Sequence, residues 1–153
     1  VDLGMFYKRR DYSVIVNGRN PIVAHEFLGD NVAGKDLIIA DDMISSGESV
    51  LDIAAQLKKM GARRIFVFAS FGLFCEAKFD AAYERGEIDR VFTTNLIYRT
   101  PELLHREWYI PVDMSKYIAY IVDTLNHDQS ISNLLNPVYR INKLLERKRA
   151  MEK

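Results

Sequence analysis

Residues 41–49, Asp-Asp-Met-Ile-Ser-Ser-Gly-Glu-Ser, follow the short apolar run 37–40, Leu-Ile-Ile-Ala. A continuous apolar run of this length is typical of a central strand that is covered on both faces. From 49 to 60 the apolar residues recur at helical spacing, and Gly61 then supplies a stop signal. The sequence therefore predicts a strand, a turn and a helix, in which residues 41–49 form the turn. We call these nine residues the acid–serine segment.

The acid–serine segment has the composition of a binding site for a phosphorylated sugar. Small residues let the backbone approach a ligand closely, and amides at the start of a helix form an anion site. The two adjacent acids would repel a phosphate, but carboxylates accept hydrogen bonds well from vicinal hydroxyls. We expect Asp41 and Asp42 to orient a sugar diol. The residues expected to hold a phosphate are Ser45, Ser46, Gly47, Glu48 and Ser49.

An ordinary strand-to-helix turn is the alternative interpretation of this segment. Ser46 or Ser49 would then cap the helix, and the helix dipole would favour Asp41 or Asp42. That interpretation explains one acid and one serine. It does not explain two acids after an apolar strand together with four small residues in five, so we favour a ligand site.

Strand and helix signals alternate along the rest of the chain, which predicts an α/β fold with a parallel sheet. The interval 11–34 is rich in Gly, Asn and Pro and predicts a long excursion that contains a short hairpin. Pro111 indicates that the last strand lies near an edge of the sheet. Further strands are predicted at 3–7, 65–69, 90–94 and 108–112, and further helices at 76–85, 115–126 and 138–151.

Composition limits the class of protein. The chain has 153 residues and is 48% hydrophobic, which is enough for one domain with a core. Lys plus Arg number 21 and Asp plus Glu number 21, so there is no basic excess of the kind that nucleic-acid or membrane-surface proteins show. No apolar run could span a bilayer and no signal-peptide pattern opens the chain. The single cysteine, Cys75, fits a reducing cytoplasm and is expected to be buried.

Several other motifs are set aside. Gly34-Lys35 lacks the upstream glycine and the following Ser or Thr of a P-loop, and His25-Glu26 lacks the second histidine of a zinc protease. The histidines have no metal-ligand spacing, so we interpret them as surface or capping residues, and we interpret the phenylalanines of 66–74 as core or subunit contacts. A ligand role for the loop 98–101 is the less favoured interpretation.

The acid–serine segment resembles the ribose-phosphate motif of the phosphoribosyltransferase superfamily, and the chain as far as Asn136 resembles one branch of it, the ribose-phosphate pyrophosphokinases. The acid pair and the small residues after it specify the superfamily, while a basic triplet and the chain's later part select the branch. The matching segments are Lys8-Arg9-Arg10, Gly29-Asp30, Gly34-Lys35, residues 59–62, Thr94-Asn95 and residues 130–135.

The resemblance implies a doubly wound parallel sheet of the type I phosphoribosyltransferase kind over 1–136, followed by a charged helix over 137–153. It implies transfer of the pyrophosphoryl group of ATP to the anomeric hydroxyl of ribose 5-phosphate, with Mg²⁺ as cofactor and no side chain of this chain assigned as a metal ligand. Lys8 would be the transition-state cation and Arg10 a contact to substrate phosphate. The family also implies a homo-oligomer, a hexamer built from dimers.

The sequence departs from the family pattern at two positions of the acid–serine segment. Ser45 stands where an Asp is common, and Glu48 stands where Gly or Ala is common, so an acid lies beside the phosphate site. The chain matches the carboxyl-terminal part of the family and begins after its ATP loop, so we expect weak ribose 5-phosphate binding without turnover. The alternatives are a free-standing phosphoribosyltransferase, for which no base-recognising hood is seen, and a non-catalytic regulatory subunit associated with a synthetase.

Overall fold

The computed structural model describes residues 2–10 and 22–152, with the backbone alone at 7–10 and 22–26. They form two compact units, 1–112 and 113–153, and each is described by itself. The sequence predicts a domain boundary after Asn136, whereas the two compact units divide after residue 112. The predicted boundary refers to the extent of the family domain and not to packing, so it stays a prediction. No helix of the described residues is both long enough and apolar enough to cross a membrane.

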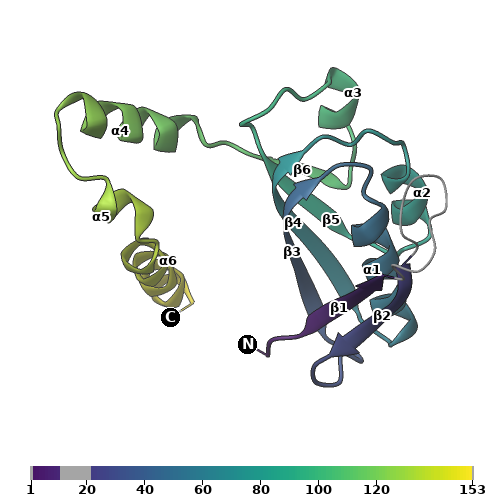
Figure 1. The fold of residues 1–153 in the computed structure, drawn as a ribbon. Helices are drawn as coiled ribbons and strands as arrows, with labels where there is room; N and C mark the ends of the chain where they lie inside the picture. The colour runs from purple at the N-terminus through teal and green to yellow at the C-terminus, as the bar shows by residue number, and fades with distance from the viewer. Residues whose placement is uncertain (1, 11–21, 153) are drawn as a thin grey trace. The chain divides into compact units, whose positions relative to one another are not determined.

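Unit 1 contains a four-stranded parallel sheet, which confirms the predicted α/β class (Figure 1). Its strands lie in the order β3-β4-β5-β6, so β6 is an edge strand as Pro111 indicated. The strands are β3 (Asp36–Ile44), β4 (Arg64–Gly72), β5 (Arg90–Thr94) and β6 (Tyr109–Val112). The connecting helices are α1 (Glu48–Lys59), α2 (Phe79–Glu84) and α3 (Pro101–Leu104).

A second, two-stranded sheet carries the basic triplet. Strand β1 (Met5–Arg10) pairs antiparallel with β2 (Ile22–Leu28), and the register shifts between Arg9 and Arg10. The first strand is thus later than the predicted 3–7 and includes the whole triplet, because its pairing with β2 continues to Arg10. Within the predicted excursion 11–34 the structure describes one strand, β2, which pairs with β1. Residues 11–21 lie outside the described residues, so the short hairpin expected inside the excursion stays a prediction.

The core lies between the sheet and helices α1 and α2. Buried sheet residues alternate along the strands, as a sheet with one covered face requires. On the helices, Val50, Leu51, Ala54, Leu57 and Phe79 are buried. The sheet residues that pack against them are Ile65, Val67, Ala69, Val91, Thr93 and Tyr109.

The other face of the sheet is open in unit 1. Ile38 is 69% exposed and Phe68 38% exposed, and Phe68 stacks on Phe92 with ring centroids 4.4 Å apart. The phenylalanines of 66–74 were expected to be core or subunit contacts. Phe74 packs on Phe79 and Trp108 in the core, whereas Phe68 and Phe71 are exposed, so a subunit contact for these two stays a prediction. This surface is available for contacts with another chain.

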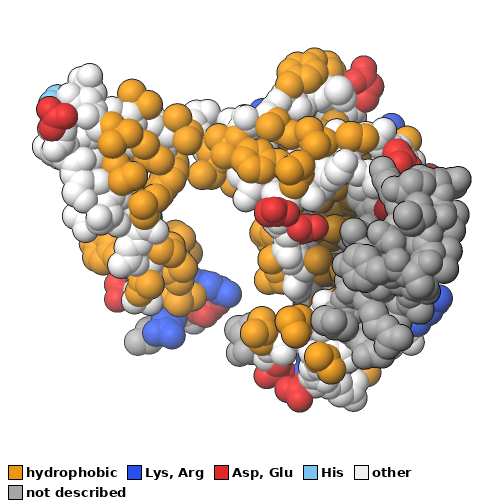
Figure 2. Space-filling view, in the orientation of Figure 1, with side chains coloured by type: hydrophobic (Ala, Val, Ile, Leu, Met, Phe, Trp, Pro, Cys, Tyr) orange, Lys and Arg blue, Asp and Glu red, His pale blue; other side chains and the backbone are white. Residues whose placement is uncertain are grey.

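Unit 2 consists of helices α4 (Ser115–Asn126), α5 (Ser132–Leu135) and α6 (Val138–Met151). The first and last of these coincide with the predicted helices 115–126 and 138–151. None of the three has a buried residue, and apolar side chains are exposed along α4 and α6 (Figure 2). Two histidines are helix caps as expected: His105 ends α3 and His127 ends α4, each with Nδ1 close to a carbonyl four residues earlier.

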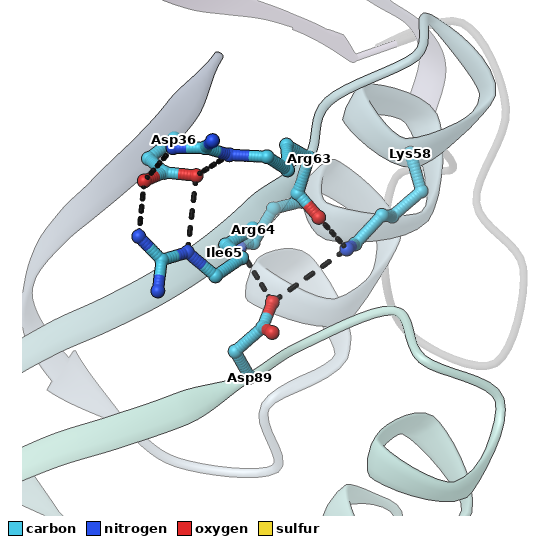
Figure 3. A network of polar contacts seen from close by, with 6 residues as sticks. All are labelled: Asp36, Lys58, Arg63, Arg64, Ile65 and Asp89. Atoms are coloured by element: carbon cyan, nitrogen blue, oxygen red, sulfur yellow. Dashed lines mark hydrogen bonds and ion pairs between the residues drawn. The ribbon is translucent and has the colours of Figure 1, made fainter. Parts of the chain in front are cut away.

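The start of β3 is fixed by a polar network (Figure 3). Asp36 accepts hydrogen bonds from Arg63 Nε at 2.7 Å and Nη2 at 2.6 Å, and from Arg64 Nε at 3.1 Å. Beside it, Asp89 accepts from the Ile65 amide at 2.8 Å and lies 3.6 Å from Lys58 Nζ. These contacts join the beginnings of β3, β4 and β5.

The turn between β3 and α1 depends on Gly47. Its φ of 81° lies in the left-handed region, and its carbonyl accepts the first helical hydrogen bond from the Leu51 amide at 2.9 Å. A Cβ at this position would lie 2.2 Å from Phe79 Cε2. Gly47 is therefore required both by the backbone conformation and by the Phe79 ring that covers it.

Replacing Gly47 by Ala should destabilise the chain more than the same change at Gly34, which has a similar φ of 71° but no atom within 4 Å of a Cβ. Gly34→Ala should cost about 1–2 kcal/mol for the left-handed backbone. Gly47→Ala should cost about 1–3 kcal/mol more, because the methyl group overpacks against Phe79. Urea unfolding of both variants measures the difference, and equal losses would contradict the role given to Phe79.

The network at Asp36 should make stability depend on pH in the acid range. Hydrogen bonds from Arg63 and Arg64 hold the pKa of Asp36 well below its usual value of 3.8. A lowered pKa contributes stability above the unfolded-state value, and that contribution is lost as pH falls below about 4. The wild-type Tm should therefore exceed that of Asp36→Asn more at pH 7 than at pH 3. Arg63→Lys keeps the positive charge but loses the forked guanidinium geometry, so its Tm at pH 7 should lie between those of the wild type and Asp36→Asn.

Candidate functional site

The acid pair lies within strand β3 and not in the turn after it. The strand was predicted to end at Ala40, and this is wrong because its pairing with β4 continues through Asp41–Ala69 and on to Ile44–Gly72. Asp41 and Asp42 thus stand three and two residues, respectively, before the end of an ordered strand. Both are exposed, and the Asp42 amide donates to Asp41 Oδ1 at 2.9 Å.

The electrostatics of the pair favour a neutralising ligand. Desolvation by the surrounding chain raises the pKa of Asp41, and the neighbouring Asp42 carboxyl raises it further. Both causes act against the charged carboxylate, whereas hydrogen-bond donors from a ligand would favour it. A perturbed carboxyl at the carboxyl edge of a parallel sheet is typical of a functional site.

The rest of the acid–serine segment forms the turn and the first turn of α1. Ser45 and Glu48 are exposed, Ser46 and Ser49 are half-buried, and Gly47 is buried. The helix begins at Glu48, one residue earlier than expected, and neither serine caps it: the capping position is Gly47, without a side-chain hydrogen bond. Ser46 Oγ instead accepts from the Glu48 amide at 3.4 Å. The predicted serine at the capping position is therefore wrong, but Ser46 still accepts from the first helical amide, so the ordinary-turn interpretation stays an alternative to the ligand site.

The loop after β4 lies directly against this turn. The Leu73 amide donates to the Ile44 carbonyl at 2.8 Å, and the Cys75 amide donates to the Ser45 carbonyl at 3.0 Å. Cys75 is exposed, with Sγ 3.9 Å from Ser45 Oγ, so the expectation of a buried thiol is wrong. The cause is the loop itself, which leaves the sheet at Gly72 and brings Cys75 to the surface beside the turn.

The same loop shortens the next helix. Helix α2 begins at Phe79, three residues later than predicted, because residues 73–77 continue along the turn and around a cavity of about 340 Å³. Leu73, Phe74, Tyr98 and Trp108 line the cavity, and no residue of the acid–serine segment does. The acid pair therefore lies on an open surface, and this cavity beside it belongs to the loops after β4 and β5.

Strand ends bring further polar groups to this edge of the sheet. Thr94 Oγ1 donates to the Ser70 carbonyl at 2.5 Å, and the Asn95 amide donates to the Val112 carbonyl at 3.1 Å. Sequence reasoning did not select Lys78, whose Nζ lies 3.9 Å from Glu48 Oε1. Nothing in the local pattern marks this lysine, because its partner stands thirty positions earlier in the chain.

The two cations predicted at the site belong to the separate two-stranded sheet. Lys8 lies opposite His25 and Arg10 opposite Ile22, at the end of β1. The side chains of Lys8 and Arg10 are outside the described part of the structure, so their approach to the acid pair stays a prediction. Within the described residues no group of three or more His, Cys, Asp or Glu could hold a metal ion.

Comparison with known proteins identifies the family. Residues 13–136 match the family described as phosphoribosyl synthetase-associated domain. The ribose-phosphate pyrophosphokinase of Shewanella oneidensis is 31% identical over 135 residues, which are 88% of this chain and 40% of the relative. The pyrophosphokinase of Haemophilus influenzae is 30% identical over 137 residues, again 88% of this chain and 40% of the relative. The chain thus spans about two-fifths of the length of these relatives.

A solved structure is similar in fold. Phosphoribosylpyrophosphate synthetase from Mycobacterium smegmatis superposes with a TM-score of 0.61 at 18% identity, covering 69% of this chain and 34% of the other. At that identity the likeness concerns the fold alone, and it agrees with the parallel sheet of unit 1. The match of residues 13–136 decides the family: this chain belongs to the phosphoribosyl synthetase-associated domains.

Proposed function

We propose that this chain forms the ribose 5-phosphate site of a ribose-phosphate pyrophosphokinase. The observation that carries the proposal is the order of groups at one edge of the sheet. Asp41 and Asp42 lie near the end of strand β3, and the amides of 46–49 follow at the turn into helix α1, which begins at Glu48. Acceptors for a diol are thus followed by donors for a phosphate. The family match makes ribose 5-phosphate the sugar phosphate to test first.

The reaction we propose for the whole protein is ATP plus ribose 5-phosphate to AMP plus phosphoribosyl pyrophosphate. The anomeric hydroxyl attacks the β-phosphorus, the bond from that phosphorus to the bridging oxygen of the α-phosphate breaks, and AMP leaves with the electron pair. Asp41 and Asp42 would fix the attacking sugar. The backbone and the hydroxyls of Ser45, Ser46, Gly47, Glu48 and Ser49 would hold its 5-phosphate. Lys8 and Arg10 would offset charge on the transferred group, so that catalysis rests on position and electrostatics.

Magnesium fits this site through the substrate and not through a protein cage. Mg²⁺ is commonly held by substrate phosphates with one or two carboxylates, and the described residues offer the exposed pair Asp41 and Asp42 without a third ligand beside them. When bound, Mg²⁺ neutralises charge on the transferred phosphates. Binding and orientation of the sugar remain the work of the chain itself.

We further propose a homo-oligomer, a hexamer built from dimers, in the cytoplasm, with neither nucleic acid nor membrane as partner. Support for subunit contacts comes from apolar side chains that each unit exposes, such as Ile38 in unit 1 and Val122 and Leu144 in unit 2. Exposed apolar patches of this kind mark interaction surfaces. The balanced charge of the chain supports the exclusion of nucleic acid.

A second candidate is a non-catalytic regulatory subunit of a synthetase. Ser45 and Glu48 favour it, since an acid lies at the start of α1 where a phosphate would bind. Lys8 and Arg10 favour a catalyst. We place the catalytic proposal first because both cations and both acids are present.

Binding and turnover separate these functions. Calorimetry should show saturable binding of ribose 5-phosphate to the 153-residue chain, with no AMP released from ATP in a coupled assay. In the full-length protein, Lys8→Ala should lower kcat by about a hundredfold or more, the scale on which loss of one charge-stabilising group acts. Absence of saturable binding would refute the proposed site. An unchanged turnover in Lys8→Ala would favour the regulator, and AMP release by the chain alone would refute the view that it needs the rest of the protein.

Asp41→Asn should weaken sugar binding without destabilising the fold at neutral pH. The pKa of Asp41 is raised in the folded chain, so this carboxyl adds to the stability of the fold at low pH, where it is protonated. That contribution is lost as pH rises through the folded-state pKa. Replacing the charged carboxylate by a neutral amide should therefore not destabilise the fold at pH 7. The amide oxygen can still accept from the Asp42 amide, but the side chain accepts fewer hydrogen bonds from hydroxyls. The Tm at pH 7 should stay equal or rise while affinity for ribose 5-phosphate falls. A fall in both would show that Asp41 is structural.

A further inference from the structure

A lysine from the loop after β4 lies beside the acid at the start of α1. Lys78 Nζ is 3.9 Å from Glu48 Oε1 and 2.7 Å from Glu76 Oε2. All three side chains are partly exposed, at 44%, 62% and 48% in the same order. The group therefore lies at the surface, next to the turn that we propose as the phosphate site.

Glu48 poses an electrostatic problem for that site. It is the first residue of α1, where the helix dipole favours an anion. Its carboxylate can take the favourable position that a phosphate would occupy, and its charge repels a phosphate nearby. A binding site at this turn therefore needs a cation that offsets the charge of Glu48.

The backbone holds Lys78 in place to do this. Hydrogen bonds from the Leu73 and Cys75 amides tie its loop to Ile44 and Ser45. The residue after Lys78 is Phe79, whose buried ring covers Gly47. The backbone of Lys78 thus lies between two contacts with the turn, the hydrogen bonds of the loop before it and the ring of Phe79 after it. Its amine lies near Glu48 on the exposed side of the turn.

The charges around the amine keep it protonated. The hydrogen bond to Glu76 raises the pKa of Lys78, and the charges of Glu48 and Asp52 raise it further. A lysine with a raised pKa carries its full positive charge throughout the neutral range. Its charge is therefore present throughout the neutral range, where a phosphate monoester is an anion.

We propose that Lys78 is a positioning residue for the substrate phosphate, which pairs with Glu48 and so cancels the charge that this acid places beside the turn. The inference rests on the proposed function of the turn as a ribose 5-phosphate site. It makes Glu48 and Lys78 a coupled pair: the lysine matters for binding because the acid is present. An ordinary surface ion pair with Glu76 alone is the competing explanation.

A double-mutant cycle tests the coupling. Calorimetry with ribose 5-phosphate at low ionic strength compares the 153-residue chain with Lys78→Ala, Glu48→Gln and the double variant. Lys78→Ala should weaken binding by about two- to fivefold, the range for one exposed charge pair at this distance. In the Glu48→Gln background the same change should weaken it by less than about twofold. Lys78→Arg should bind as the wild type does, and the loss in Lys78→Ala should shrink in 0.5 M salt because exposed charges are screened.

Controls separate this role from stability and from general charge. Lys59→Ala removes an exposed lysine at the far end of α1 and should leave binding unchanged at the same ionic strength. Glu76→Gln breaks the closer ion pair of Lys78. It should not weaken binding, because Lys78 can still pair with Glu48. Thermal unfolding of each variant confirms that the fold is intact.

The outcomes are distinct. Equal binding by the wild type and Lys78→Ala would overturn the inference while leaving the ribose 5-phosphate site in place. An equal loss in both Glu48 backgrounds would also overturn it, because Lys78 would then act on the phosphate directly. No saturable binding by the wild-type chain would instead refute the proposed function, and this inference with it.

Discussion

The contact between Gly47 and the ring of Phe79 is the constraint on which the site depends. Phe79 is buried in the core between α1, α2 and the sheet, and it also lies against Phe74 and Trp108. Because the ring leaves no room for a Cβ at position 47, the turn can approach the core closely. The amides that follow, from Glu48 onward, are thereby placed at one edge of the sheet, four residues beyond the end of β3. A change in the core at Phe79 would therefore move the proposed phosphate site without touching a ligand.

The sequence predicts most elements whose signals are local. Helices α4 and α6 coincide with their predicted ranges, and β5 does as well, because spacing and flanking turn residues define them. It fails where pairing between distant segments decides the boundary. Strand β3 continues through Asp41 and Asp42 because β4 offers partners as far as Gly72, and no propensity of two acids indicates this. Tertiary pairing there overrides local composition.

The candidate site shows the same division. The acids and serines are adjacent in the chain, so their chemistry can be read from one segment. Cys75 and Lys78 reach the turn only through the loop after β4, whose path depends on hydrogen bonds to the Ile44 and Ser45 carbonyls. Opposite charges thirty residues apart carry no pattern that a single sequence reveals. Long-range contacts of this kind require the fold.

Strand β3 carries the acid pair and is an edge strand of its sheet, paired among the described residues with β4 alone. The apolar run 37–40 predicted a central strand covered on both faces, and this is wrong for unit 1, where Ile38 is exposed. An edge strand held on one side can shift unless its ends are fixed. At the start of β3, Asp36 accepts hydrogen bonds from the guanidinium groups of Arg63 and Arg64. At the end of β3, the Ile44 carbonyl accepts a hydrogen bond from the Leu73 amide. Asp41 and Asp42 lie between these two attachments, so the network of Figure 3 positions the acids from the opposite end of the strand. Loosening Asp36 should therefore weaken sugar binding as well as stability, because the geometry of a diol contact tolerates little displacement of its carboxylates.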